Sequence, residues 1–265
     1  MMLKDNILEY VPERPCPVAS CCFATPAEPV DVKSLIPDAN LRRRMGPLLR
    51  LAAACGMSAL GNVNPDNVAG IITSTGLGFM KDTVNFADML IDRNEEMLNP
   101  SPFMQSTFNT VSGYIALLGG IRTYNTAYVH RSGGFAAALT DAMMLVGDGN
   151  VLVGGFDEAS PEVDEYRRKL GCWKRWDFLP LGEGAGFLCL GGVDNGVRIL
   201  GVHSSRSGPT CDSKVLCSSY VERLGAFFSI LPVVLCIVIG QRPQGRILVV
   251  DDVNPCGPAV LLEID

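Results

Sequence analysis

Residues 123–160, which read TYNTAYVHRSGGFAAALTDAMMLVGDGNVLVGGFDEAS, constrain the fold more than any other part of the chain. Residues 124–129 are a short β-prone run, and the His-Arg-Ser-Gly-Gly sequence at 130–134 interrupts it. Residues 135–146 are rich in Ala and Met, which predicts a helix that can pack closely against neighbouring backbone. A glycine-containing turn ends this helix, and a buried strand is predicted from residue 151. The stretch therefore predicts a strand, a sharp turn, a helix and a second strand.

The turn at 130–134 is a place where chemistry can occur, because it precedes a helix. The first amides of a helix have no partner within it, and they lie at the positive end of the helix dipole. Such a position can lower the pKa of a thiol or stabilise an oxyanion. The residue at the turn, however, is His130, and residues 123–160 contain no cysteine.

This stretch resembles the nucleophile elbow of the β-ketoacyl synthases, which belong to the thiolase-like superfamily. In that family a strand ends in the active-site Cys, small residues and a helix follow, and the next strand ends in Gly-Gly and an acidic residue. His130 stands where the family has its Cys. The other segments that match the family, in the same order, are Asn-Pro-Ser-Pro-Phe at 99–103 with Asn109, Thr110, Val111 and Gly113, then Gly-Gly-Phe-Asp-Glu at 154–158, and the segment from Trp176 and Asp177 to Gly-Glu-Gly-Ala-Gly at 182–186.

The resemblance covers residues 16–207 and implies an α/β fold of the thiolase-like type, a mixed sheet with helices on both faces. The alternation of predicted strands and helices supports this fold class. A β-ketoacyl synthase has two similar halves, and 265 residues are too few for both. We therefore expect a single domain over residues 1–265, in which 16–207 correspond to a complete first half and 208–265 to an abbreviated second half.

Apolar patterning predicts further elements before the elbow. Strands are expected at 17–24 and 68–73, and helices at 41–60, 82–97 and 103–120. Gly46 and Pro47 are expected to kink the first helix or to delay its start. The second helix is expected to bury a stripe of Phe86, Met89 and Leu90, and the third helix is expected to be buried.

The C-terminal part is predicted to contain a helix at 212–230 and strands at 197–204, 233–239, 246–250 and 259–262. The run from 224 to 239 is the most hydrophobic of the chain. It is shorter than the roughly 18–20 residues that a membrane span needs, and it contains Pro232. We therefore expect a strand that is buried on both faces, and no membrane span.

The composition indicates which ligands the chain is not expected to bind and in which cellular environment it is expected to occur. With a formal net charge of −6, the chain is not expected to bind nucleic acid. Its 10 cysteines form no Cys-X-X-Cys pair and several lie in apolar runs, so reduced thiols are expected rather than disulfides or a zinc site. The N-terminal segment MMLKDNILEYVPERP lacks the apolar core of a signal peptide. We expect a cytoplasmic protein with no metal and no cofactor.

The resemblance also implies which chemistry is missing. Condensation in this family requires a Cys thiolate that holds the acyl chain, and two histidines from the second half that polarise the malonyl thioester and stabilise the carbanion. This chain has only 2 histidines, His130 and His203, and no His-Gly-Thr-Gly-Thr sequence. His203 lies in a predicted strand, where a single His is more often structural. The chain is therefore not expected to be a condensing enzyme itself.

Two interpretations of His130 stay open. An imidazole at a helix N-terminus could act as a base or assist decarboxylation. Alternatively, His130 and Arg131 only fill space or face a partner subunit. Similarly, the arginines at 42–44 could bind an acidic carrier protein or form a solvated helix face. Glu183 and Asp157 are expected to hold loops and backbone rather than to form a catalytic pair.

Catalytically inactive relatives that resemble ketosynthases favour a function as a chain-length-factor-type subunit. Such a subunit pairs with an active β-ketoacyl synthase in polyketide or fatty-acid biosynthesis, aryl-polyene biosynthesis included. The dimer is expected to form through residues 103–120 and 124–129, with acyl carrier protein as a further partner. The residues expected to line an acyl channel or the interface are Met104, Phe108, Tyr114, Arg131, Ser132 and Gly133. The alternatives are a small acyl-thioester hydrolase or transferase that uses His130, and a homodimeric scaffold.

Overall fold

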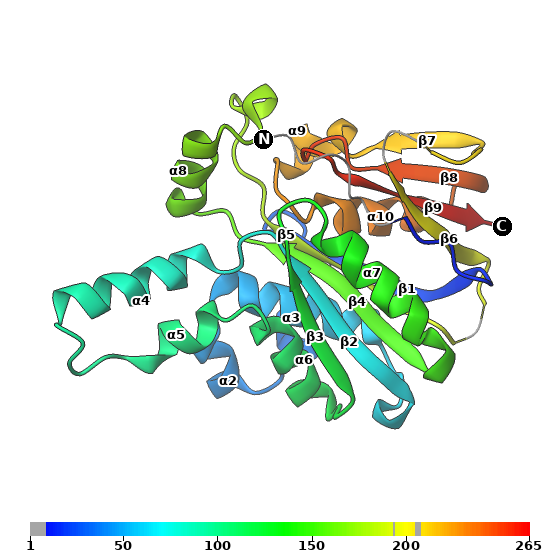
Figure 1. The fold of residues 1–265 in the computed structure, drawn as a ribbon. Coiled ribbons are helices and arrows are strands. Elements are labelled where there is room, and N and C mark those ends of the chain that lie inside the picture. Colours follow the sequence, from blue (N-terminus) through cyan, green and yellow to red (C-terminus); the bar gives the residue numbers. More distant parts are fainter. Residues whose placement is uncertain (1–8, 193, 205–207) are drawn as a thin grey trace.

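The computed structural model describes residues 9–192, 194–204 and 208–265, and these contain one mixed sheet of nine strands (Figure 1). The order of the strands in the sheet is β3-β2-β4-β5-β1-β6-β9-β8-β7. The strands are β1 (Cys16–Ala24), β2 (Val68–Thr75), β3 (Tyr124–Val129), β4 (Asn150–Asp157), β5 (Gly184–Leu190), β6 (Val197–Ser204), β7 (Ser213–Leu216), β8 (Gly245–Val250) and β9 (Pro258–Ile264).

Helices connect and cover these strands. The α-helices are α1 (Val32–Leu35), α2 (Ala39–Arg44), α3 (Pro47–Leu60), α4 (Met80–Asp92), α5 (Pro100–Ser106), α6 (Thr110–Gly119), α7 (Gly134–Leu145), α8 (Pro161–Leu170), α9 (Val221–Leu224) and α10 (Ile230–Gln241). The short 3-10 helices are η1 (Pro65–Asn67), η2 (Val146–Asp148), η3 (Lys174–Trp176) and η4 (Cys217–Tyr220).

The sheet consists of a five-strand part and a four-strand part that are narrowly joined. In the first part, β3, β2 and β4 run parallel, and β5 and β1 continue the sheet in antiparallel fashion. In the second part, β6, β9 and β8 are antiparallel and β7 is parallel to β8. The two parts meet through β1 and β6, which pair only at Cys16 with Ile199 and at Pro17 with Arg198.

Helices lie on both faces of the five-strand part. Successive residues of a strand point to opposite faces, so Ile71 of β2 belongs to the core that α3 and α6 cover, whereas Ile72 belongs to the core of α7 and α10. Residues of the four-strand part join this second core from its other side. The helices α7 and α10 therefore form a middle layer between the two parts of the sheet. The predicted mixed sheet with helices on both faces is confirmed.

The most hydrophobic run forms the helix α10, and the strand predicted at 233–239 is wrong. Every residue from Ile230 to Ile239 is buried, because the helix lies in the middle layer. A helix that is apolar all round has no periodic pattern that distinguishes it from a buried strand. Pro232 fits in the first helical turn, where its missing N–H has no intrahelical acceptor. Among the described residues, no helix has the length and apolarity to cross a membrane.

Three other helix predictions need correction. The predicted helix at 212–230 is wrong, since these residues contain β7, η4 and α9. The helix predicted at 41–60 is divided into α2 and α3 by a break at Met45 and Gly46. Pro47 starts α3, in agreement with the delayed helix start that was expected from Gly46 and Pro47. The helix predicted at 103–120 is also divided, between α5 and α6, and it is only partly buried.

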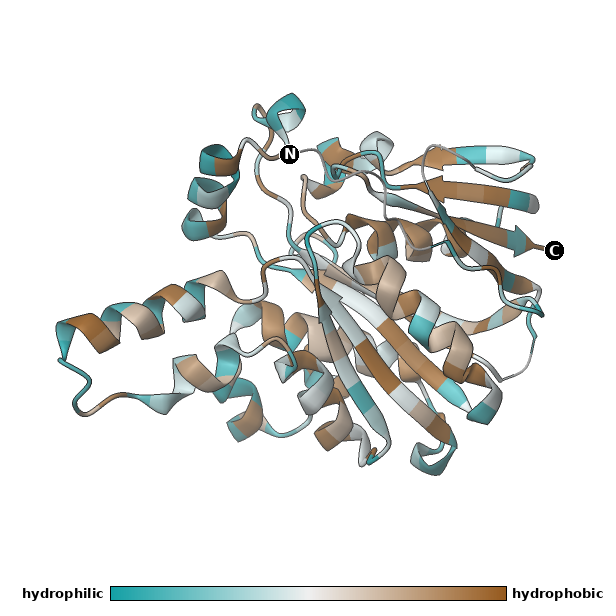
Figure 2. Ribbon diagram, viewed as in Figure 1, coloured by the Kyte–Doolittle hydropathy of each residue, from teal (hydrophilic) through white to brown (hydrophobic). Residues whose placement is uncertain are grey.

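The helices α4 and α5 extend from the body as an arm (Figure 1). Polar and apolar residues alternate along α4 (Figure 2), but in the arm α4 packs mainly against the short helix α5. Phe86, Met89 and Leu90 are therefore only half-buried, and the predicted buried stripe is wrong. The Phe86 ring packs against that of Phe103 on α5, with 5.2 Å between the ring centroids. The helix ends at Asp92, five residues before the predicted end at 97.

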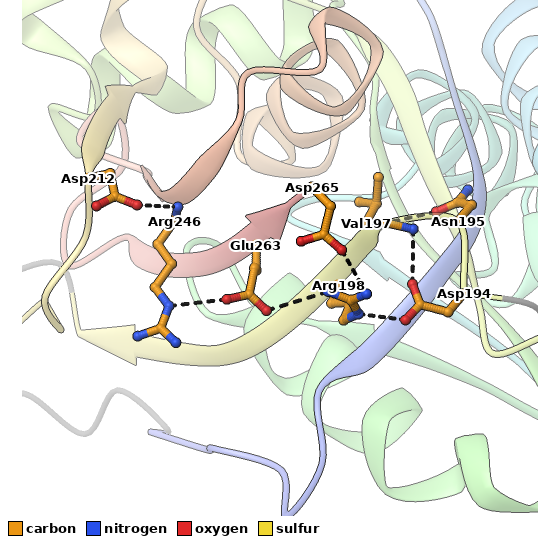
Figure 3. Close-up of polar contacts among 9 residues, drawn as sticks. Asp194, Asn195, Val197, Arg198, Asp212, Arg246, Glu263 and Asp265 are labelled. Atoms are coloured by element: carbon orange, nitrogen blue, oxygen red, sulfur yellow. Dashed lines mark hydrogen bonds and ion pairs between the residues drawn. The ribbon is translucent and has the colours of Figure 1, made fainter.

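Ion pairs connect three strands of the four-strand part (Figure 3). Arg198 on β6 contacts Asp194, Glu263 and Asp265. On the other side of Glu263, the Nε of Arg246 on β8 lies 3.2 Å from the Oε1 of Glu263. These side chains are partly exposed, so solvent screens the pairs and each pair adds little to stability. These ion pairs therefore fix the relative positions of β6, β9 and β8 more than they stabilise the fold.

A substitution of Gly186 tests the close packing of α10 on β5. An added Cβ at this residue would lie 2.5–2.6 Å from backbone atoms of Pro232 and Val233, which cannot rotate away. We expect Gly186→Ala to lower the free energy of unfolding by about 1–3 kcal/mol, measured by urea denaturation. Gly240→Ala is the matched control, because nothing lies within 4 Å of its added Cβ. Equal midpoints for the two variants would contradict the close packing.

Candidate functional site

The strand β3, the turn at 130–133 and the helix α7 form the predicted elbow. The N–H of His130 donates to the carbonyl O of Thr75 at 3.2 Å, which extends the pairing of β3 with β2 to the end of the strand. The N–H of Gly134 then donates to the carbonyl O of His130 at 3.3 Å and starts α7. The predicted strand at 124–129, the turn and the helix after it are confirmed.

The imidazole of His130 stabilises this turn. It is exposed, and its Nδ1 accepts the N–H of Gly133 at 2.9 Å. Because Nδ1 is the acceptor, the proton of the neutral ring is on Nε2. The bond satisfies one of the amides that a helix start leaves without a partner. Arg131 is exposed at the same turn, and Ser132 and Gly133 are half-buried.

The second histidine lies far from the elbow in the sheet. His203 belongs to β6 and pairs with Ala259 of β9. Four strands separate β6 from β3 in the sheet order. Burial lowers the pKa of His203, and among the described residues its Nε2 has no hydrogen-bond partner. The two imidazoles therefore do not form the pair that decarboxylation in this family requires.

Aromatic side chains fill the space above the carboxyl end of β2. The Phe228 ring occupies the place that a Cβ at Gly76 would take. Its centroid lies 4.5 Å from that of Trp173, and both residues are buried. The cavity beside them, which Leu77 and Asp157 also line, has a volume of about 10 Å³. It cannot hold an acyl group.

Asp157 joins three segments at the carboxyl ends of β2 and β4. Its Oδ1 accepts the hydroxyl of Thr75 and the N–H of Gly76, each at 2.9 Å, and the N–H of Leu77 at 3.3 Å. Its Oδ2 accepts the N–H of Ser229, before α10, at 2.7 Å. Burial raises the pKa of this carboxyl, whereas the four donors oppose that shift.

Two neighbouring carboxylates also hold backbone. Glu183 accepts the N–H of Ala159 at 3.0 Å. Glu158 accepts the N–H of Lys81 in the first turn of α4 at 3.2 Å, and burial raises the pKa of Glu158 to about 7. The prediction that Asp157 and Glu183 hold loops and backbone is confirmed.

A second buried polar group fixes Phe228, and sequence reasoning missed it. The Nε1–H of Trp173 donates to the Oδ1 of Asn254 at 2.8 Å. The Nδ2 of Asn254 donates to the carbonyl oxygens of Phe227 and Phe228 and to Asp251. Burial raises the pKa of Asp251 to about 6. The Asp-Asp-Val-Asn-Pro turn signal at 251–255 marks this loop, but it does not identify Trp173 as its partner.

A groove of about 590 Å³ lies along the outer side of β3. Its lining residues are Thr83, Ser106, Thr107, Phe108, Asn109, Asn125, Thr126, Ala127 and Val129. Of the predicted channel residues, Phe108 lines the groove, and Met104 is exposed on α5 outside it. Tyr114 packs against the core that contains α3. In the described residues β3 is an edge strand, so one side of its backbone has no neighbouring strand.

Exposed apolar side chains surround this edge. They come from α5, α6, β3, α7 and the segment between α5 and α6, and each is 43–68 % exposed. We call them the β3-side apolar surface, which consists of Phe103, Met104, Phe108, Leu117, Tyr124, Val129 and Met144. Large apolar groups gathered on one side of a soluble fold commonly mark an interaction site.

The elbow and the two-part sheet define the thiolase-like class of α/β protein. The profile of the beta-ketoacyl synthase N-terminal domain matches residues 18–170, more than half of the chain. The chain therefore belongs to the β-ketoacyl synthase family. No curated protein matches its sequence.

Solved structures share the whole fold at low sequence identity. The ishigamide ketosynthase/chain length factor is 13% identical over 95% of this chain and 99% of that chain, with a TM-score of 0.73. The ketosynthase ApeO in complex with its chain length factor ApeC, from Xenorhabdus doucetiae, is 16% identical over 95% and 100%, with a TM-score of 0.63. The AntDE:AntF complex, a type II acyl-carrier protein with its ketosynthase, is 14% identical over 94% and 99%, with a TM-score of 0.65.

A substitution of Asp157 tests whether its carboxylate holds the site together. In Asp157→Asn, an amide group replaces one acceptor oxygen and leaves a buried N–H without a partner. We expect the free energy of unfolding to fall by about 1–3 kcal/mol in urea denaturation. Asp148→Asn, at an exposed turn, is the control and should change it by less than about 0.5 kcal/mol. A wild-type midpoint for Asp157→Asn would contradict this function.

Proposed function

We propose that this chain is a non-catalytic, chain-length-factor-type subunit that pairs with an active β-ketoacyl synthase. The pathway would be polyketide or fatty-acid biosynthesis, with aryl-polyene biosynthesis as one candidate. The observation that carries the proposal is the elbow itself: it has the strand, turn and helix expected of the family, but His130 stands at the place of the nucleophile and accepts the N–H of Gly133. The chain thus keeps the scaffold without the reactive sulfur.

The surroundings of the elbow support the same conclusion. A condensing site needs space for an acyl chain and two imidazoles beside the nucleophile. Phe228 and Trp173 fill the space above β2, and His203 lies on β6. An isolated chain therefore has no means to hold or to decarboxylate an acyl thioester at this site.

The β3 edge and the β3-side apolar surface support a subunit that is covered by a partner. An unpaired strand edge presents N–H and C=O groups that another chain can bind. The surface adds the exposed side chains of Met104, Phe108 and Met144. Arg131, Ser132 and Gly133 lie at the end of β3, on the rim of this surface. The solved structures that pair a ketosynthase with a chain length factor support a synthase as the partner.

Acyl carrier protein is a further proposed partner of the assembled dimer, and the AntDE:AntF complex supports it. The arginines of α2 add little to that contact: Arg42 donates to the carbonyl oxygens of Ile36 and Pro37, and Arg43 to Asn40. Their bonds favour the solvated-face interpretation. We also propose that residues 208–265 are a shortened second half in one domain with residues 16–207, and that the dimer is cytoplasmic.

A charge on the β3-side apolar surface tests the docking. We expect Met104→Asp to weaken binding of the partner synthase at least about tenfold, because a carboxylate would have to be buried. Each β-ketoacyl synthase encoded beside this gene is produced together with the chain, and its affinity is measured after co-purification. Leu170→Asp is the matched control: Leu170 is 51 % exposed and Met104 58 %, but Leu170 lies on α8.

The two variants separate the proposal from its alternatives. Equal losses for Met104→Asp and Leu170→Asp would argue against docking through β3. A chain that stays monomeric and binds none of these synthases would refute the subunit function. A stable homodimer of the isolated chain, measured by light scattering, would favour the scaffold alternative.

Replacement of His130 tests the hydrolase or transferase alternative. We expect the isolated chain to show no turnover of acyl-CoA or acyl-carrier thioesters, and His130→Ala to leave this unchanged. The variant should lose about 0.5–2 kcal/mol of unfolding free energy, because the N–H of Gly133 loses its acceptor. Arg131→Ala is the control for a change at the same exposed turn. Thioester turnover that disappears in His130→Ala would support the enzyme instead.

A further inference from the structure

Four thiols meet around the strand β1. All 10 cysteines are free, as the sequence predicted, but these four are neighbours. The Cys55 Sγ of α3 lies 3.2 Å from the carbonyl O of Cys22, and the Cys236 Sγ of α10 lies 3.3 Å from the same oxygen. The Cys21 Sγ lies 3.9 Å from the carbonyl O of Cys236. The helices α3 and α10 cover opposite faces of the five-strand part, so Cys22 pairs with Cys55 and Cys21 with Cys236.

The pair of Cys22 and Cys55 has the shorter sulfur-to-carbonyl contact of the two pairs, 3.2 Å against 3.9 Å. The helix α3 approaches β1 closely because small residues, Ala52, Gly56 and Ala59, are buried along it. Cys22 and Cys55 belong to the same core, on the face of the sheet that α3 covers. A disulfide has an S–S distance of about 2.05 Å, so the two sulfurs have to move together from this packing contact.

The two sulfurs of this pair differ in access and acidity. Cys22 is half-buried, whereas Cys55 is fully buried. The hydrogen bond from Cys55, with a smaller contribution from Ser58, lowers the pKa of the Cys22 thiol to about 7. Burial raises the pKa of Cys55 well above its usual value. Cys22 is therefore the thiolate that a reagent in solution can reach, and Cys55 is the protonated neighbour.

We propose that Cys22 and Cys55 are a peroxide-reactive thiol pair that closes a disulfide between β1 and α3. The Cys22 thiolate attacks one oxygen of hydrogen peroxide, the O–O bond breaks, and the leaving hydroxide takes up a proton to become water. Cys22 is then a sulfenic acid. The Cys55 sulfur attacks the Cys22 sulfur, the S–O bond breaks, and the leaving hydroxide takes the Cys55 proton as the second water. Two thiols and one peroxide thus give one disulfide and two waters.

Among the other cysteines, Cys21 and Cys236 come nearest to this combination. A hydrogen bond with Cys236 lowers the pKa of the half-buried Cys21, and burial raises the pKa of Cys236, but their sulfur-to-carbonyl contact is longer, at 3.9 Å. Burial raises the pKa values of Cys16 and Cys189, which disfavours their thiolates. Cys256 is exposed and has no thiol among its hydrogen-bond partners, so it can be oxidised but has no thiol to resolve it. It serves as an internal reporter that peroxide has reached the protein. The pair of Cys21 and Cys236 serves as the neighbouring comparison on the other face of β1.

Peptide mapping of the full chain tests the proposal. The chain is treated with hydrogen peroxide, the remaining thiols are blocked, and tryptic peptides are analysed by mass spectrometry. Cys55 is the only cysteine in the peptide 51–81, and Cys22 lies in the peptide that ends at Lys33. We expect these two peptides to be joined with the loss of two hydrogens, and the link to disappear in Cys22→Ser but to persist in Cys21→Ser.

A sulfenic-acid trap resolves the order of the steps. In Cys55→Ala, peroxide with dimedone should place the adduct on Cys22, which fragment spectra distinguish from Cys16 and Cys21 in the same peptide. Circular dichroism verifies that this variant is folded; the half-buried Cys22→Ser is the second variant if it is not. The proposal is overturned by a link that survives in Cys22→Ser, by a link to the Cys236 peptide 224–246 alone, or by no link in a dimedone-free sample whose Cys256 is oxidised by the peroxide.

Discussion

The buried carboxylate of Asp157 is the interaction on which the arrangement of the molecule depends. It receives hydrogen bonds from the loop after β2, through Thr75, Gly76 and Leu77, and from Ser229 before α10. A carboxylate without these donors would be costly in a fully buried position, and the donors would be costly without it. The same group therefore fixes the carboxyl ends of β2 and β4 and the start of the middle-layer helix from the C-terminal part of the chain.

Close packing of the middle layer follows from this anchor. The helix α10 lies directly on β5, where Gly186 leaves room for the backbone of Pro232. Phe228, just before α10, then covers Gly76 at the end of β2, and Asn254 holds its backbone from the second part of the sheet. The C-terminal part thus places an aromatic side chain, Phe228, against the end of β2. Its contribution that the structure shows is close packing on the five-strand part of the sheet.

The sequence was sufficient for the elements with a clear local signal, and it failed where tertiary context decides. The elbow at 124–146 and the strand Val197–Ser204 were predictable because turn residues bound them. The helix α10 was taken for a strand, since an all-apolar run fits both structures and only its position between two layers selects one. The exposed arm could not be foreseen, because Phe86 and Met89 have the spacing of a core-facing stripe. For the site, the sequence alone shows that no Cys stands at the turn. The hydrogen bond from the N–H of Gly133 to His130 could be found only from the structure.

The bond at His130 gives the elbow a structural contact of its own. Amides at the start of a helix can stabilise charge that develops during a reaction, but an amide that already donates to a side chain is occupied. In this chain the Nδ1 of His130 occupies the amide of Gly133, and the turn gains a bond that a reactive thiolate would not have provided. The strand β3 leads into the elbow and carries the exposed Tyr124 and Val129 at an open sheet edge, so the elbow fixes the geometry of the surface that a partner would contact.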